Sequence, residues 1–124
     1  MSGKNQRVAV LGASPKPERY SNQAVAMLKD YEYEVLPVNP SGISIHNLLT
    51  AKSLDEIKVP VWTLTMYVGA AISSGQKDAI LKLKPKRAIF NPGTENPELE
   101  MMLENNGIEI IHACTLVLLR TGQF

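Results

Sequence analysis

The sequence predicts an α/β domain built on a doubly wound parallel sheet. Short apolar runs bounded by turn residues are expected to be buried strands, and they fall at residues 8–11, 34–38, 61–68, 87–90 and 108–112. Segments with a helical spacing of apolar residues alternate with these runs, which is typical of parallel strands joined by helices. Because such crossovers are right-handed almost without exception, helices are expected on both faces of the sheet.

The helical segments follow from apolar spacing and from residues that start or end a helix. Residues 24–31 place apolar side chains three and four positions apart, and residues 72–83 do the same. Asn96 followed by Pro97 is typical of a helix start, and Gly107 is placed to end that helix.

Two segments have a weaker pattern. Residues 49–52 are expected to form a short edge strand, and residues 53–56 fit a capping box that opens a short helical turn. The apolar run at residues 116–119 either packs across the sheet edge or forms a contact with another subunit. The sequence therefore leaves open whether the chain forms a homo-oligomer or binds a protein partner.

Composition excludes several functional classes. The 124 residues give room for one domain, expected to span residues 1–124, and 44% of them are hydrophobic, enough for a packed core. A net charge of +1 excludes a generally basic nucleic-acid coat, so no nucleic-acid partner is expected. No run approaches the ~18 apolar residues of a membrane helix, and residues 1–7 do not lead into a signal peptide. A single cysteine, Cys114, suits a reducing compartment, so a cytoplasmic location is expected.

Each predicted strand leads into a distinctive peptide. These peptides cover residues 12–22, 39–40, 67–69, 91–95 and 113–114. Because parallel strands bring their carboxyl ends to one edge, the five peptides are expected to converge there. Ligands of such sheets bind at this edge, where the direction of winding reverses.

The peptide after the first strand has the features of a phosphate site. Gly12 permits a tight turn and a close approach of the backbone to a ligand. Ser14, Ser21 and the N–H groups at the helix start can cradle phosphate oxygens, and Lys16 and Arg19 add positive charge. The loop is about nine residues long, beyond the usual two to six, and long loops are more often functional. The alternative is a plain connection stiffened by two prolines.

The same region does not match a nicotinamide dinucleotide site. Gly12 is present, but Ser14 replaces the second glycine of the G-x-G-x-x-G pattern. The strand at residues 34–38 is followed by Asn39-Pro40, with no acidic residue for the ribose hydroxyls. This counts against NAD and leaves a phosphorylated adenine nucleotide as a ligand class.

Several motifs taken together resemble the CoA-binding domain family. They are Gly12-Ala-Ser-Pro15, Tyr20-Ser-Asn22, Pro37-Val-Asn-Pro40, the peptide at residues 91–96 and the peptide at residues 113–116. The family consists of small Rossmann-like proteins similar to the CoA-binding domain of the succinyl-CoA synthetase alpha subunit, and the resemblance covers about residues 7–119. It implies a Rossmann-like sheet of order 3-2-1-4-5-6 with a short third strand.

The resemblance also implies that the chain binds coenzyme A or an acyl-CoA without evident catalysis. The residues implied to face the CoA phosphates, or to lie within the same motifs, are Gly12, Ala13, Ser14, Pro15, Lys16, Arg19, Tyr20, Ser21 and Asn22. Asn39 and Pro40 are implied to flank the adenosine end. The remaining candidate contacts are Tyr67 and Val68, in the wall that meets pantetheine, and Asn91, Pro92 and Gly93 at the next strand end. The synthetase's catalytic phosphohistidine belongs to a second domain, so binding without ligation is implied, and no catalytic residue is assigned.

Two alternatives remain open: a small acyl-CoA or nucleotide-dependent enzyme, and a degenerate Rossmann domain that serves as an interaction protein. The enzyme would use His112 and Cys114, which lie two residues apart at a strand end. A lone buried cysteine is more often packing, however, and no Cys, His or acidic spacing is typical of a metal site. The basic run at residues 84–87 is expected at the amino edge of the sheet as solvated charge, opposite the site.

Overall fold

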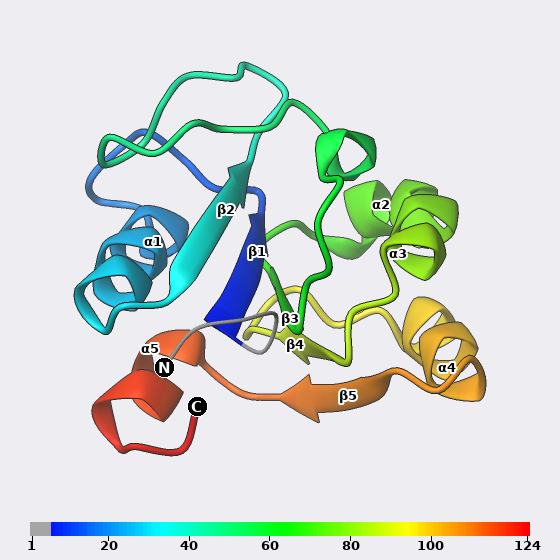
Figure 1. Cartoon of the computed structure of the whole chain (residues 1–124). Coiled ribbons are helices and arrows are strands. Elements are labelled where there is room, and N and C mark those ends of the chain that lie inside the picture. The colour runs from blue at the N-terminus through cyan, green and yellow to red at the C-terminus, as the bar shows by residue number, and fades with distance from the viewer. Residues whose placement is uncertain (1–5) are drawn as a thin grey trace.

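The computed structural model describes residues 6–124 and contains a five-stranded parallel sheet (Figure 1). The strands are β1 (Arg7–Leu11), β2 (Glu34–Val38), β3 (Thr63–Met66), β4 (Arg87–Phe90) and β5 (Glu109–His112). They lie in the order β2-β1-β3-β4-β5, and every neighbouring pair is parallel. Because the chain winds outward to β2 and then returns to β3 on the other side of β1, the winding reverses between β1 and β3.

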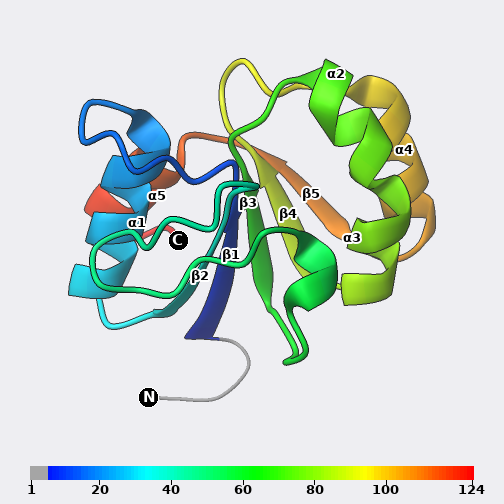
Figure 2. The ribbon, with the colours of Figure 1, turned by 90° about the horizontal axis from the view of Figure 1, so that it is seen from above.

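Helices cover both faces of the sheet (Figure 2). One face carries α1 (Tyr20–Asp30) and α5 (Thr115–Arg120). The other face carries α2 (Ala70–Ser73), α3 (Lys77–Leu83) and α4 (Pro97–Asn105), together with the short 3-10 turns η2 (Leu54–Glu56) and η3 (Ser74–Gln76). The predicted doubly wound, Rossmann-like α/β class is therefore confirmed. None of the helices within residues 6–124 has the length and apolar character needed to cross a membrane.

The side chains of β1 alternate between the two buried layers, as the two-residue period of a strand requires. Val8 and Val10 face the layer of α1 and α5, whereas Ala9 and Leu11 face the layer of α3 and α4. The second layer includes Phe90, which is 1% exposed. Burial of a side chain of that size contributes about 1.5–3 kcal/mol, so the two layers fix the sheet between its helices.

The expected short third strand at residues 49–52 is reduced to a single bridge between Val38 and Ala51. Ala51 donates its N–H to Pro37 O at 3.0 Å and accepts from Asn39 N at 2.9 Å. Pairing stops there because the Asn39 carbonyl, the acceptor for the next rung of a parallel ladder, instead accepts the Gly42 N–H at 2.9 Å in a turn. The sheet therefore has five strands where six were expected, and those five keep the expected order.

The predicted helix at residues 72–83 is also wrong in detail. It divides into α2, η3 and α3, with Gly75 inside the 3-10 turn. The Asn96 side-chain amide donates to Ser73 Oγ at 2.9 Å and to Ser74 Oγ at 3.0 Å, which fixes the turn where the helix divides. The strand expected at residues 61–68 is confined to β3, and the helix expected at 24–31 begins earlier, at Tyr20.

The apolar run at residues 116–119 forms most of α5, a helix that the sequence pattern does not predict. Leu116 and Leu119 are 4% and 3% exposed, and Leu119 packs with the core beneath α1. Val117 lies on the outer side and is 50% exposed. The two leucines are thus buried within the chain, on the face of the sheet that carries α1, where packing across the sheet edge was one of the two expectations.

Candidate functional site

Gly12 lies where the chain leaves β1, at the point where the winding of the sheet reverses. Its φ is +89°, and its N–H donates to Val38 O at 3.0 Å. A Cβ atom at this position would lie 2.7 Å from Val68 Cγ1 and 2.9 Å from Tyr67 O. The loop after β1 therefore packs directly against the end of β3, which brings three of the predicted site residues together.

The serine hydroxyls predicted to contact phosphate hold the loop itself in shape. Ser21 Oγ accepts from Ser14 N, and Ser14 Oγ accepts from Lys16 N, both at 3.1 Å. Asn22 Nδ2 donates to Ser14 O at 2.8 Å. Each hydroxyl keeps its own hydrogen for donation to a further acceptor. These residues thus order the loop and still present donors.

Two further segments are tied to this loop. Asn39 Nδ2 donates to Ala13 O at 2.6 Å, and Asn39 Oδ1 accepts the amide N–H two residues further on at 2.8 Å, beside the exposed Pro40. On the other side, His46 Nε2 lies 2.8 Å from Asn22 Oδ1. His46 has no predicted role, because nothing in its local sequence pattern points to the start of α1.

The exposed side of the loop leads to an uncapped helix start. Pro15, Lys16, Arg19 and Tyr20 are all exposed. Arg19 occupies the N-cap of α1, no side chain among the described residues caps the helix, and the first turn holds no acidic residue. Among residues 6–124, neither Lys16 nor Arg19 forms an ion pair. Free amides, the helix dipole and two cations together favour an anion at this position.

A pocket of about 460 Å³ lies between the start of α1, α5 and the ends of β3 and β4. Its lining residues are Tyr20, Tyr67, Asn91, Pro92, Cys114, Leu116 and Arg120. The first four belong to the predicted site, whereas Leu116 and Arg120 are missed because the pocket depends on how α5 packs. A second pocket, of about 380 Å³, lies between η2 and α3, away from these strand ends.

Asn91 connects β3, β4 and the start of α5 beneath the pocket. Its Nδ2 donates to Thr65 Oγ1 at 2.7 Å and to Met66 O at 2.8 Å, while its Oδ1 accepts from Thr115 N at 2.8 Å. The two threonine hydroxyls are themselves 2.8 Å apart. Asn91 is only 2% exposed, so its side chain positions the pocket and has no polar atom left over for a ligand.

Gly93 is not a member of the pocket lining. Its φ is +90°, and its N–H donates to both carboxylate oxygens of Glu95 at 3.0 and 3.2 Å. Both residues therefore belong to the turn that leads into α4.

Tyr67 has a buried hydroxyl that makes no hydrogen bond of ordinary geometry with a described residue. Burial raises the pKa of Tyr67 to about 12, and the nearby Thr115 and Thr65 hydroxyls offset part of that rise. The neutral phenol is consequently the form that this site holds.

The raised pKa gives an expected pH dependence. Because the folded pKa of Tyr67 lies above the ordinary value of about 10, its contribution to stability is fully present below pH ~10 and is lost as the pH rises towards 12. We expect tyrosinate absorbance to show one of the four tyrosines ionising late. The Tyr67→Phe variant should lack that step and lose less stability over this range. A single transition of all four near pH ~10 would contradict the prediction.

His112 and Cys114 lie in different surroundings, which does not support their pairing as a nucleophile. His112 Nε2 is 2.6 Å from Glu100 Oε1 of α4, and the same carboxylate accepts from Asn96 N at 2.8 Å. Cys114 instead lines the pocket beside α5. Within residues 6–124, no three His, Cys, Asp or Glu side chains gather in a way that could hold a metal ion.

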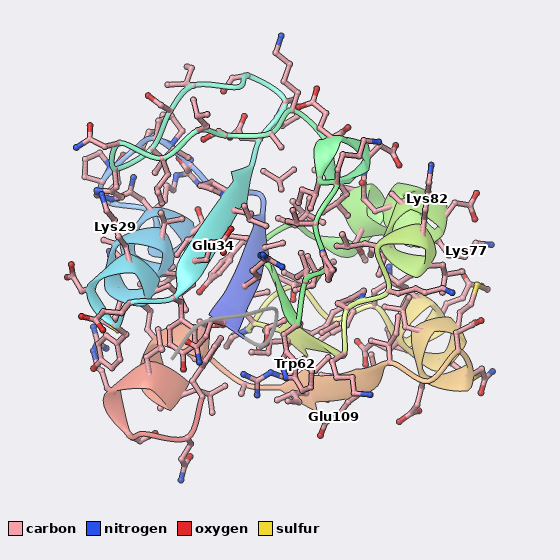
Figure 3. The ribbon with its side chains drawn as sticks, viewed as in Figure 1. Lys29, Glu34, Trp62, Lys77, Lys82 and Glu109 are labelled. Atoms are coloured by element: carbon pink, nitrogen blue, oxygen red, sulfur yellow. The ribbon has the colours of Figure 1, made fainter. Side chains whose placement is uncertain are left out.

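The basic run before β4 lies at the amino edge of the sheet, as expected. Arg87 is only partly exposed, and it donates to Thr63 Oγ1 at 2.8 Å and to Phe124 O at 2.7 Å. It therefore serves as a structural link there. Lys77 and Lys82 lie on the outer side of α3, across the sheet from α1 (Figure 3).

Comparison with known proteins identifies the family. The family model described as CoA binding domain matches residues 6–120. The Bacillus subtilis protein YneT is 27% identical over 120 residues, which cover 90% of this chain and 89% of YneT. The crystal structure of an uncharacterized protein aligns with a TM-score of 0.91 and 38% identity over 98% of this chain and 100% of the other. A dinucleotide-forming acetyl-coenzyme A synthetase from Ca. Korarchaeum cryptofilum shares the fold, with a TM-score of 0.75 and 23% identity over 89% of this chain and 26% of the synthetase. This chain belongs to the CoA binding domain family.

Proposed function

We propose that this protein binds coenzyme A or an acyl-CoA at the carboxyl edge of its sheet. The observation that carries the proposal is the position of Tyr20. It is the first residue of α1, directly after the 12–19 loop, and it is also part of the pocket wall. One elongated ligand can therefore place its phosphates on the loop and its neutral arm in the pocket. Membership of the CoA binding domain family supports the same ligand.

The loop supplies what a pyrophosphate needs. Lys16 and Arg19 are exposed cations, and no side chain within residues 6–124 caps the amides at the start of α1. Backbone N–H groups at a helix start favour bound phosphate through their direct hydrogen bonds and the helix dipole. The hydrogen bonds of Ser14 and Ser21 hold the loop in place before the ligand arrives, which lowers the entropic cost of binding.

The pocket suits the pantetheine arm, which is uncharged and ends in a thiol or thioester. Tyr20, Pro92 and Leu116 contribute apolar surface, and Cys114 adds a polarizable thiol. A volume of about 460 Å³ falls within the range of small-molecule sites, which are mostly apolar with a few polar groups.

The end of β2 argues against a nicotinamide dinucleotide. Asn39 occupies the position where such sites carry an acid for the ribose hydroxyls. Its side-chain amide and carbonyl are already engaged by Ala13 O and by the N–H of Ser41. The ribose of NAD would therefore find no acceptor with a full negative charge at this position.

Titration calorimetry with CoA and with NAD tests the proposal directly. We expect CoA to bind at least ~10-fold more tightly, a difference of about 1.4 kcal/mol. In thermal melting, a ligand at ~100 times its dissociation constant adds about 2.7 kcal/mol of stability, so CoA should raise the melting temperature well above that of the free protein. Equal shifts with NAD and CoA, or no shift with CoA, would contradict the proposal.

The cations of the loop provide a second test of the same site. Charge-assisted hydrogen bonds contribute roughly 1.5–3 kcal/mol, so Lys16→Ala with Arg19→Ala should weaken CoA binding at least ~10-fold. The matched control is Lys77→Ala with Lys82→Ala, which removes two cations from α3 on the opposite face (Figure 3). That pair should change the affinity less than about threefold, because distant charges are screened at moderate salt. A larger loss in the control than in the loop variant would overturn the placement of the phosphates.

A further inference from the structure

Among residues 6–124, Arg120 is the only charged residue that lines the pocket, and no acidic side chain of this part of the chain accompanies it there. It is the last residue of α5 and is exposed. Among the hydrogen bonds and ion pairs of residues 6–124, none uses its guanidinium group. The pocket therefore carries one positive charge that no side chain of the described residues neutralises.

The usual structural role for a cation at a helix end is already filled. Arginine near a C-terminus can bind the last carbonyl groups of a helix. Here the carbonyl groups of Val117, Leu118 and Leu119 accept backbone N–H groups from residues 121–124. Capping of α5 therefore does not require the Arg120 side chain.

The spacing of residues along α5 places this charge at one end of the pocket. Leu116 and Arg120 are four residues apart, which puts them on the same face of the helix, and both line the pocket. Cys114 and Arg120 are separated by six residues, a rise of roughly 9 Å along a helix. The lining next to α5 thus runs from a thiol, past an apolar side chain, to a guanidinium group.

We propose that Arg120 binds a carboxylate at the far end of the acyl group, so that the preferred ligand is a carboxyacyl-CoA. This inference rests on the proposed function, because it needs the thioester arm in the pocket. An apolar stretch followed by a cation matches an acyl chain of a few methylene groups that ends in a carboxylate. Arginine is suited to this role because its planar guanidinium group can form two parallel hydrogen bonds with one carboxylate. The CoA phosphates have their own cations, Lys16 and Arg19, on the loop.

The test compares acyl groups of equal length that differ only at their ends. Succinyl-CoA is paired with butyryl-CoA, and glutaryl-CoA with pentanoyl-CoA, and free CoA is titrated first to establish that the site binds the nucleotide. We expect the wild-type protein to bind one or both carboxyacyl ligands at least ~10-fold more tightly than the matched methyl-ended ligand, the effect of one charge-assisted contact. The Arg120→Gln variant should lose that preference and keep the affinity for butyryl-CoA and pentanoyl-CoA within about twofold.

Three results would overturn the inference. Equal wild-type affinity within both pairs would show that the pocket does not select a carboxylate. If Arg120→Gln lost affinity equally for all ligands, free CoA included, Arg120 would contact the part of the ligand that they share, such as the CoA phosphates, and not the acyl group. Binding of free CoA but of no acyl-CoA would show that the pocket does not accommodate acyl groups. Failure of free CoA itself to bind would instead refute the proposed function, and this inference with it. Lys82→Gln on α3 is the matched control, and unchanged melting of Arg120→Gln checks that its fold is intact.

Discussion

Alanine at position 12 is expected to lower the free energy of unfolding by about 2–5 kcal/mol. A residue with a Cβ in the left-handed region costs roughly 1–2 kcal/mol, and Gly12 has a φ of +89°. Overpacking adds about 1–3 kcal/mol, because the new Cβ would lie 2.9 Å from Tyr67 O, a backbone atom, and 2.7 Å from Val68 Cγ1. Val68 can move its side chain, but the Tyr67 carbonyl can move only with the end of β3.

Gly93→Ala is the matched control for this substitution. Gly93 has nearly the same φ, +90°, but nothing lies within 4 Å of its added Cβ. Gly93→Ala should therefore lower the free energy of unfolding only by the backbone strain of a left-handed alanine, about 1–2 kcal/mol. Urea unfolding of both variants measures the difference. Equal losses would show that the contact between Gly12 and the end of β3 is looser than the structure indicates. We also expect Gly12→Ala, and not Gly93→Ala, to weaken CoA binding, because only the former displaces the loop.

The strands were largely predictable because burial on both faces leaves a local signal. Residues 34–38 and 87–90 have the same bounds in the sequence prediction and in β2 and β4. Both faces of a parallel sheet are covered by helices, so short continuous apolar runs bounded by turns identify its strands. The order of the strands came from the family resemblance, and the five that form agree with it.

Two of the errors in the fold, the divided helix and the missed α5, come from contacts that are distant in sequence. The break between α2 and α3 is held by Asn96, more than twenty residues away, which binds Ser73 and Ser74. The missing third strand depends on a local competition, in which the Asn39 carbonyl accepts the Gly42 N–H in a turn. The capping pattern at residues 53–56 matches η2, but the strand predicted directly before it does not form. Helix α5 was missed because it is short and its buried Leu119 packs with residues of β1, β2 and α1 that are distant in sequence.

The candidate site was predictable to the same extent as the fold. The residues that follow the strand ends could be predicted from the sequence, whereas those brought in by the packing of α5 could not. The convergence of Gly12, Tyr67 and Asn91 at one edge follows from parallel topology alone, and the structure brings them together. The part played by α5 could not be predicted, because Arg120 enters the pocket only through the packing of that helix. The binding roles of all these residues stay predictions until a ligand is titrated.

Replacing Asn91 with alanine is expected to have the other large effect, and should lower the free energy of unfolding by about 2–6 kcal/mol. The substitution leaves the Thr115 N–H and the Met66 carbonyl without their present partners, and an unsatisfied buried group costs roughly 1–3 kcal/mol. Thr65 Oγ1 loses a donor as well but keeps its contact with Thr115 Oγ1 at 2.8 Å. Because one side chain joins β3, β4 and the start of α5, its removal should also loosen the pocket, so CoA affinity should fall together with stability.

Asn106→Ala is the control, since it removes an exposed asparagine whose Nδ2 donates to Met102 O at 2.8 Å. An exposed hydrogen bond of this kind contributes about 0.5–1.5 kcal/mol, and Asn106 lies far from the pocket lining at the end of α4. Denaturant unfolding should therefore show a clearly larger loss of stability for Asn91→Ala than for Asn106→Ala. If Asn91→Ala does not fold, Asn91→Ser, which retains a short hydroxyl towards the same groups, should fold with an intermediate loss. Comparable stability of the Asn91 and Asn106 variants would mean that water entering from the pocket satisfies the Thr115 amide and the Met66 carbonyl. The side chain of Asn91 would then be dispensable for joining the three elements.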